Sequence, residues 1–112
     1  MEPTLEQIFG ANATQDATDI VIKKADLVAV GLVAAADNNP ESLFVALIKN
    51  AALILTPENR DLNADQSIVI GEYSESISTS LVNNAIRSFN QITVPVELYT
   101  VRDAISINPM NY

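Results

Sequence analysis

Residues 40–55, PESLFVALIKNAALIL, constrain this chain most, because they predict a helix that is apolar on nearly every side. Asn39 is a suitable N-cap, Pro40 suits the first helical position, and Glu41 places a carboxylate near the positive end of the helix dipole. Apolar residues then recur at three- and four-residue spacing until Pro57 ends the pattern. A helix of this kind has to be buried on most of its sides.

The length of this segment limits what can cover it. About 16 residues are fewer than the roughly 20 that span a bilayer. The second face of the helix is therefore expected to meet either a sheet of its own chain or another subunit, and we favour the chain's own core. The whole chain has 112 residues, which is the size of one ordinary domain.

Period-two patterns predict strands on both sides of this helix. Residues 18–24 alternate in polarity, and residues 67–82 place serine at alternate positions, with Tyr73, Ile77 and Leu81 on the opposite face. The pair Asn83-Asn84 tolerates left-handed backbone and suits a hairpin turn. A helix over residues 77–89 is the alternative. We favour the hairpin, because the Ser, Thr and Asn residues between the apolar positions are poor helix formers.

Together these elements predict an α+β fold. A small, mainly antiparallel sheet, with strands near Ile20, Val69, Ile77 and Val94, is expected to pack on the central apolar helix, and Pro95 limits the last strand to an edge or a bulge. Residues 27–36 fit either a buried strand or a lead-in to the helix, and residues 56–66 are expected to be a polar loop. We expect one domain, 1–112, made of an N-terminal arm (1–17), a core (18–101) and a C-terminal arm (102–112).

The composition excludes several kinds of function. The chain has no Cys and no His, which removes thiol nucleophiles, disulfides, the usual zinc ligands and the usual general base. Glu72 and Glu75 lie three residues apart in a predicted strand and would face opposite sides, so they are not expected to act as paired carboxylates. The net charge of −8 argues against nucleic acid or an anionic membrane as a partner. We expect no enzyme and no cofactor.

One acidic segment matches part of a calcium-binding loop. Oxygen-bearing residues occupy its first, third, fifth, seventh and twelfth positions, namely Asp61, Asn63, Asp65, Ser67 and Glu72. The sixth position, where the sharp turn needs Gly, is Gln66, and the exit looks like a strand. We therefore favour an ordinary acidic loop and expect no metal site. A small cytoplasmic binding or regulatory module, tuned by calcium through residues 61–72, is the alternative.

Two stretches resemble small uncharacterised proteins of cyanobacterial phages and prophage-like loci, of the kind encoded among virion structural genes. They are residues 4–27, TLEQIFGANATQDATDIVIKKADL, and residues 38–48, NNPESLFVALI. The resemblance covers roughly the first half of the chain. It implies a virion structural protein that is made in the host cytoplasm and works as a homo-oligomer. Its position would be the capsid decoration (cement) layer or the neck or tail, and its partners would be copies of itself and other virion proteins.

The assembly hypothesis points to apolar residues in the polar terminal segments. At the N-terminus these are Leu5, Ile8 and Phe9, and at the C-terminus Ile105, Ile107 and Tyr112. The N-terminal residues are acidic and lack the apolar run of a secretory signal. The serine face predicted over residues 74–80 is a second candidate, because a flat, uncharged strand can pair with another chain, although a simple solvated face fits the same pattern.

Overall fold

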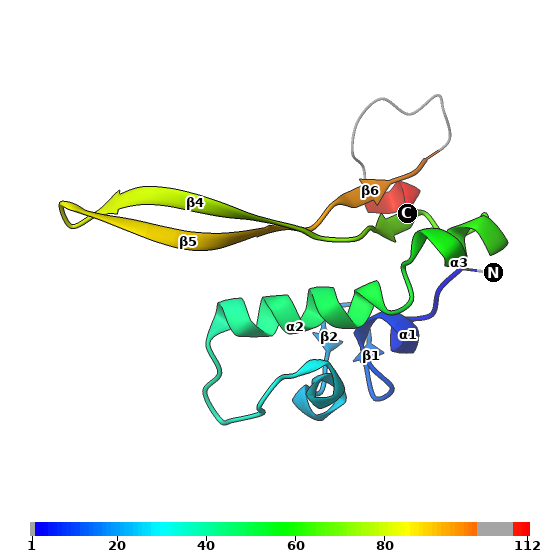
Figure 1. The fold of residues 1–112 in the computed structure, drawn as a ribbon. Helices are drawn as coiled ribbons and strands as arrows, with labels where there is room; N and C mark the ends of the chain where they lie inside the picture. The colour runs from blue at the N-terminus through cyan, green and yellow to red at the C-terminus, as the bar shows by residue number, and fades with distance from the viewer. Residues whose placement is uncertain (1, 101–108) are drawn as a thin grey trace.

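The computed structural model describes residues 2–100 and 109–112. Figure 1 shows a body of helices and short strands, from which one long β-hairpin extends. The radius of gyration is 17.0 Å, whereas a compact domain of about 100 residues has about 13 Å. The hairpin accounts for this expanded shape. The predicted α+β class is confirmed.

The first helix, α1 (Leu5–Phe9), begins with a capping box, in which Thr4 accepts from the Gln7 N–H and the Gln7 side chain accepts from the Thr4 N–H. It ends at Gly10, whose φ is +119° and where an added Cβ would lie 2.6 Å from the Asp26 Cβ. The helix packs on α2, and Asn50 Nδ2 of α2 donates to the Ile8 carbonyl over 2.8 Å. The described part of the predicted N-terminal arm, residues 2–17, is thus folded against the body.

The main core lies beneath α2 (Pro40–Ala52). Strands β1 (Thr14–Gln15) and β2 (Ile20–Val21) form a short antiparallel pair and lead into the 3₁₀ helix η1 (Lys24–Val30). Leu27, Val30 and Leu32 of this region are buried against Ala46 of α2, with Ile22, Leu43 and Leu47 packed around them. Residues 27–36 form no strand: they contain the end of η1 and then chain without regular secondary structure that leads toward α2.

Helix α2 begins as predicted, with the Asn39 side chain accepting from the Glu41 N–H over 2.8 Å and Pro40 in the first turn. Its burial differs from the prediction. Ala46 is its one buried residue, whereas Phe44 and Val45 are more than half exposed. The expectation that the chain covers this helix on most sides is therefore wrong for the described residues, because the core occupies one side only.

The segment predicted as a polar loop contains a helix, α3 (Pro57–Leu62), capped by Thr56, whose hydroxyl accepts from the Asn59 N–H over 3.0 Å. Gln66, only 1% exposed, follows it. Its Nε2 donates to the carbonyls of Thr56, at 3.0 Å, and Ile68, at 2.8 Å. This side chain joins α3 to the next strand.

The remaining strands form two antiparallel ribbons in series. Strand β3 (Ile68–Ile70) pairs with β6 (Val96–Leu98), and β4 (Ser74–Val82) pairs with β5 (Ala85–Thr93). Between the ribbons the Gly71 N–H donates to the Pro95 carbonyl over 3.0 Å. The single sheet expected from the sequence is therefore wrong, since the described strands form three separate two-stranded sheets.

The β4–β5 hairpin confirms the strand interpretation of residues 77–89 and rejects the helical one. Its register runs from Ser74 opposite Thr93 to Val82 opposite Ala85. Asn83 and Asn84 form the two-residue turn with φ of 50° and 64°. Positive φ at both positions is the type I′ geometry, whose twist matches that of the flanking strands.

Candidate functional site: an uncovered apolar hairpin face

The two faces of the β4–β5 hairpin differ in chemistry. Residues directly opposite one another in an antiparallel pair share a face. By register, one face carries four apolar side chains, which we call the apolar hairpin face: Ile77, Leu81, Ile86 and Ile92. The other, which we call the serine face, carries the four alternating serines together with the charged Arg87 and three apolar residues: Ser74, Ser76, Ser78, Ser80, Arg87, Val82, Ala85 and Phe89. The predicted serine face is therefore confirmed, as is the position of Ile77 and Leu81 opposite to it.

The described residues leave the apolar hairpin face uncovered. Ile77 and Ile86 are each 77% exposed, Leu81 is 69% exposed and Ile92 is 57% exposed. A two-stranded hairpin alone is marginally stable in water and gains stability when an apolar face packs on something else. Apolar residues gathered on one exposed face commonly mark a site of interaction.

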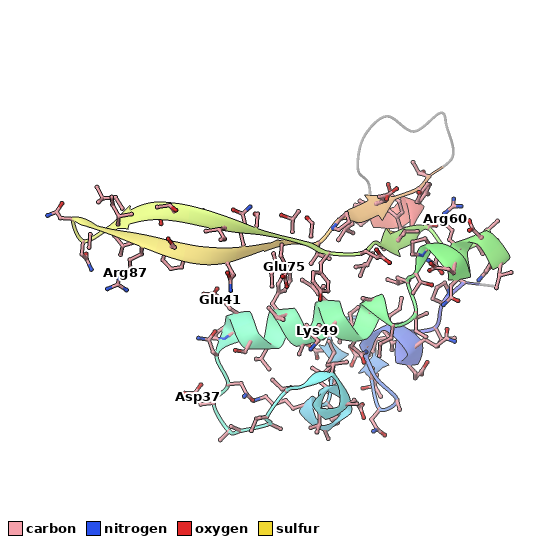
Figure 2. The ribbon with its side chains drawn as sticks, viewed as in Figure 1. Asp37, Glu41, Lys49, Arg60, Glu75 and Arg87 are labelled. Atoms are coloured by element: carbon pink, nitrogen blue, oxygen red, sulfur yellow. The ribbon has the colours of Figure 1, made fainter. Side chains whose placement is uncertain are left out.

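A groove lies where the base of the hairpin approaches α2. It measures about 580 Å³ and is lined from the helix by Val45, Ile48 and Lys49, and from the ribbon by Tyr73, Glu75, Ile92 and Val94. Figure 2 shows Glu75 pointing from the hairpin toward α2. Ile92 belongs to both the groove and the apolar hairpin face, so the two features form one continuous surface.

The base of the ribbon is fixed to the body by several contacts. The Ile70 N–H donates to the Leu55 carbonyl, and the Tyr99 N–H donates to the Ser67 carbonyl, both over 2.7 Å. The Arg60 guanidinium lies 3.8 Å from the centre of the Tyr99 ring. The Tyr99 hydroxyl donates to Glu97 Oε2 over 2.8 Å, and this hydrogen bond to a carboxylate raises the pKa of Tyr99. These contacts set the direction in which the hairpin leaves the body.

The structure brings three of the six terminal candidates together. Ile8, Phe9 and Tyr112 line one pocket of about 310 Å³. Leu5 is half-buried in the same helix, α1. Ile105 and Ile107 lie outside the described residues. The described candidates thus lie close to their own chain, and their role in an interface stays a prediction.

The structure does not assemble the calcium-loop positions into a site. Asp61 lies in α3, Glu72 follows β3, and the buried Gln66 lies between these elements. The Asn63 side chain accepts from the Asp65 N–H over 3.2 Å. Within residues 2–100 and 109–112, no three acidic, His or Cys side chains are grouped to hold a metal ion. The helix–loop–helix geometry of such sites is absent from this described segment, where a strand follows the loop.

The sequence signals missed part of this site. The period-two pattern located the apolar face, but Val45 and Ile48 of α2 were expected to be buried by a sheet and instead line the groove.

None of the described helices is long and apolar enough to cross a membrane. Comparison of the chain with protein-family models, with curated proteins and with solved structures finds no match.

Proposed function

We propose that this protein is a structural component of a phage particle, in the capsid decoration layer or in the neck or tail, and that it works by homo-oligomeric assembly. The observation that carries the assembly proposal is the apolar hairpin face, whose four side chains are each more than half exposed. Fully burying an Ile or Leu side chain contributes about 1.5–3 kcal/mol. A partner that covers this face therefore gains a substantial free energy of binding.

The virion proposal is supported by the resemblance of residues 4–27 and 38–48 to proteins encoded among virion structural genes. In the structure these residues form α1, the β1–β2 pair, the start of η1 and most of α2. They contribute the body that holds the hairpin. A folded body with a projecting apolar ribbon suits a subunit that attaches to a repeating lattice.

Light scattering after size exclusion tests the assembly proposal. We expect the wild-type chain to form a defined oligomer, and the variant Ile77→Ser/Leu81→Ser to shift to monomer with its circular dichroism unchanged. The matched control is Ser76→Ala/Ser80→Ala on the opposite face of the same strand, which is expected to assemble normally. A wild-type chain that stays monomeric at every concentration would contradict the proposal. Mass spectrometry of purified particles tests the virion assignment.

A further inference from the structure

The tip of the hairpin and the groove at its base are complementary surfaces that cannot meet within one chain. The groove contains Ile92, which pairs with Glu75. Leu81 lies six residues beyond Glu75 on β4 and pairs with Ile86 near the turn. At about 3.4 Å per residue, Leu81 is therefore about 20 Å from the groove. Each molecule thus presents apolar side chains at the tip and an apolar groove at the base, and it cannot fill its own groove with its own tip.

The low charge of the hairpin allows a second copy of the chain to be the occupant. The chain carries a net charge of −8, so two copies repel each other over most of their surfaces. Over residues 74–93 the charged residues are Glu75 and Arg87 alone, which gives this segment no net charge. Glu75 lies at the base and Arg87 lies near the turn, where it pairs with Ser80. Arg87 lies on the serine face, so Glu75 is the one charged residue of this segment on the face that the second copy would cover.

The available area also fits a dimer. Six apolar side chains on the groove and the hairpin are more than half exposed: Val45, Tyr73, Ile77, Leu81, Ile86 and Ile92. At roughly 100 Å² each, as transfer free energies of 1.5–3 kcal/mol imply, they offer on the order of 600 Å² per copy. A standard interface buries about 800 Å² per partner. About 600 Å² per copy, or about 1,200 Å² in total, lies at the lower end of the standard range of about 1,200–2,000 Å².

We propose that two copies exchange hairpins about a two-fold axis, so that the tip of each hairpin, with Leu81 and Ile86, fills the groove between α2 and the hairpin base of the other. Such an interface is self-complementary and closes, because each copy donates the same surface that it receives. The inference rests on the proposed function, since it names the contact through which the oligomer forms.

Engineered disulfides test the exchange, because the chain has no Cys of its own. In the variant Leu81→Cys/Ile92→Cys, the two thiols of one chain are about 20 Å apart, whereas a disulfide needs Cα atoms about 4.4–6.8 Å apart. A bond between the two positions is therefore intermolecular. We expect mild oxidation to give covalent dimers, with mass spectrometry of the peptides showing the bond between position 81 of one copy and position 92 of the other.

The control variant is Ser80→Cys/Thr93→Cys. Its positions are separated by the same six residues along the ribbon, since Thr93 pairs with Ser74, but they lie on the serine face. We expect at least ten-fold less cross-linked dimer from it. If wild-type chains form an oligomer by light scattering but the 81–92 bond is no more abundant than the control bond, the hairpin exchange is wrong and the assembly proposal stands. If the chains are monomeric at every protein concentration, both the hairpin exchange and the assembly proposal are wrong.

Discussion

The body and the β4–β5 hairpin carry apolar side chains of the same kinds but bury them very differently. In the body, Leu27 is 2% exposed against α2 and Leu32 is also buried. In the hairpin, Ile77 and Ile86 are mostly exposed, although the backbone of the hairpin is fully paired across its nine-residue strands. The same residue types are therefore buried in one region and exposed in the other. In this chain, the contacts that a residue makes decide whether it is a core position or a candidate interface position.

The two regions also differ in what orders their backbones. The body uses polar side chains that bridge distant segments: Asp26 accepts from the backbone N–H and from Nδ2 of Asn12, each over 2.8 Å. Gln66 bridges α3 and β3 in the same way. The hairpin instead relies on its own ladder and its type I′ turn. Substitutions in the body should therefore change the stability of the fold, and substitutions in the hairpin should mainly change assembly.

The largest expected contrast is between two leucines. Leu27→Ala removes a side chain from the core and should lower the free energy of unfolding by about 2–5 kcal/mol. Leu81→Ala, on the exposed hairpin face, should change it by less than about 0.5 kcal/mol in the monomer. Urea denaturation at a protein concentration too low for assembly measures the free energy of unfolding of both variants. Equal losses for the two variants would show that the hairpin face is already covered within the monomer.

A buried polar side chain gives the next contrast. Gln66→Ala leaves the carbonyls of Thr56 and Ile68 without its amide and should lower the free energy of unfolding by about 1–3 kcal/mol. Gln91, exposed on β5, provides the matched control, and Gln91→Ala should fall within about 0.5 kcal/mol of wild type. Thermal or urea unfolding of the monomer measures the difference. A negligible effect at Gln66 would contradict its role in joining α3 to β3.

The turn allows the hairpin to be weakened by itself. Asn84 has φ of 64°, and a residue without the tolerance of Asn or Gly loses about 1–2 kcal/mol there. Asn84→Val should therefore destabilise the hairpin and reduce assembly, while NMR chemical shifts around Leu27, away from the groove, stay the same. Asn84→Gly keeps the turn and should assemble normally. Broad shift changes around Leu27 in the Val variant would mean that the two regions are not independent.

The smallest expected effect is the pH dependence of stability that Asp16 contributes in the turn before β2. The pKa of Asp16 is lowered because Oδ1 accepts from the backbone N–H groups of Thr18 and Asp19, each over 2.8 Å, and from the Thr18 hydroxyl. A lowered pKa in the folded state means that this contribution to stability is present above the unfolded pKa and is lost as the pH falls through the folded pKa. NMR titration should show Asp16 titrating below its ordinary value. The variant Asp16→Asn should lack this part of the acid dependence, whereas titration at or above the ordinary value would refute these hydrogen bonds.

The features predicted from the sequence are those that depend on a few neighbouring residues. The Asn39 cap, the alternation of serine with apolar residues in β4 and the Asn83-Asn84 turn are fixed by local hydrogen bonds and backbone preference. Helix α3 had comparable signals, with Thr56 as its cap and Pro57 in its first turn. The same Pro57 also ends the apolar pattern of the preceding helix, and that second signal hides the start of α3.

The features that the sequence did not predict depend on distant residues. The exposure of Phe44 and Val45 follows from the separation of the strands into three pairs, which leaves no sheet to cover α2 among the described residues. The pocket shared by Ile8, Phe9 and Tyr112 joins opposite ends of the chain. The candidate site was thus half predicted, since periodicity located the apolar face but gave no information about what covers it.

Amide hydrogen exchange measured across a dilution series tests the central claim most directly. If a second copy covers the apolar hairpin face, amides of residues 74–93 and those of α2 near Val45 should exchange more slowly in the assembled protein than in the dilute monomer. The amides around Leu27 should exchange at nearly the same rate in both. Hairpin amides that exchange at one rate at all concentrations, while light scattering shows an oligomer, would place the interface elsewhere and contradict this account.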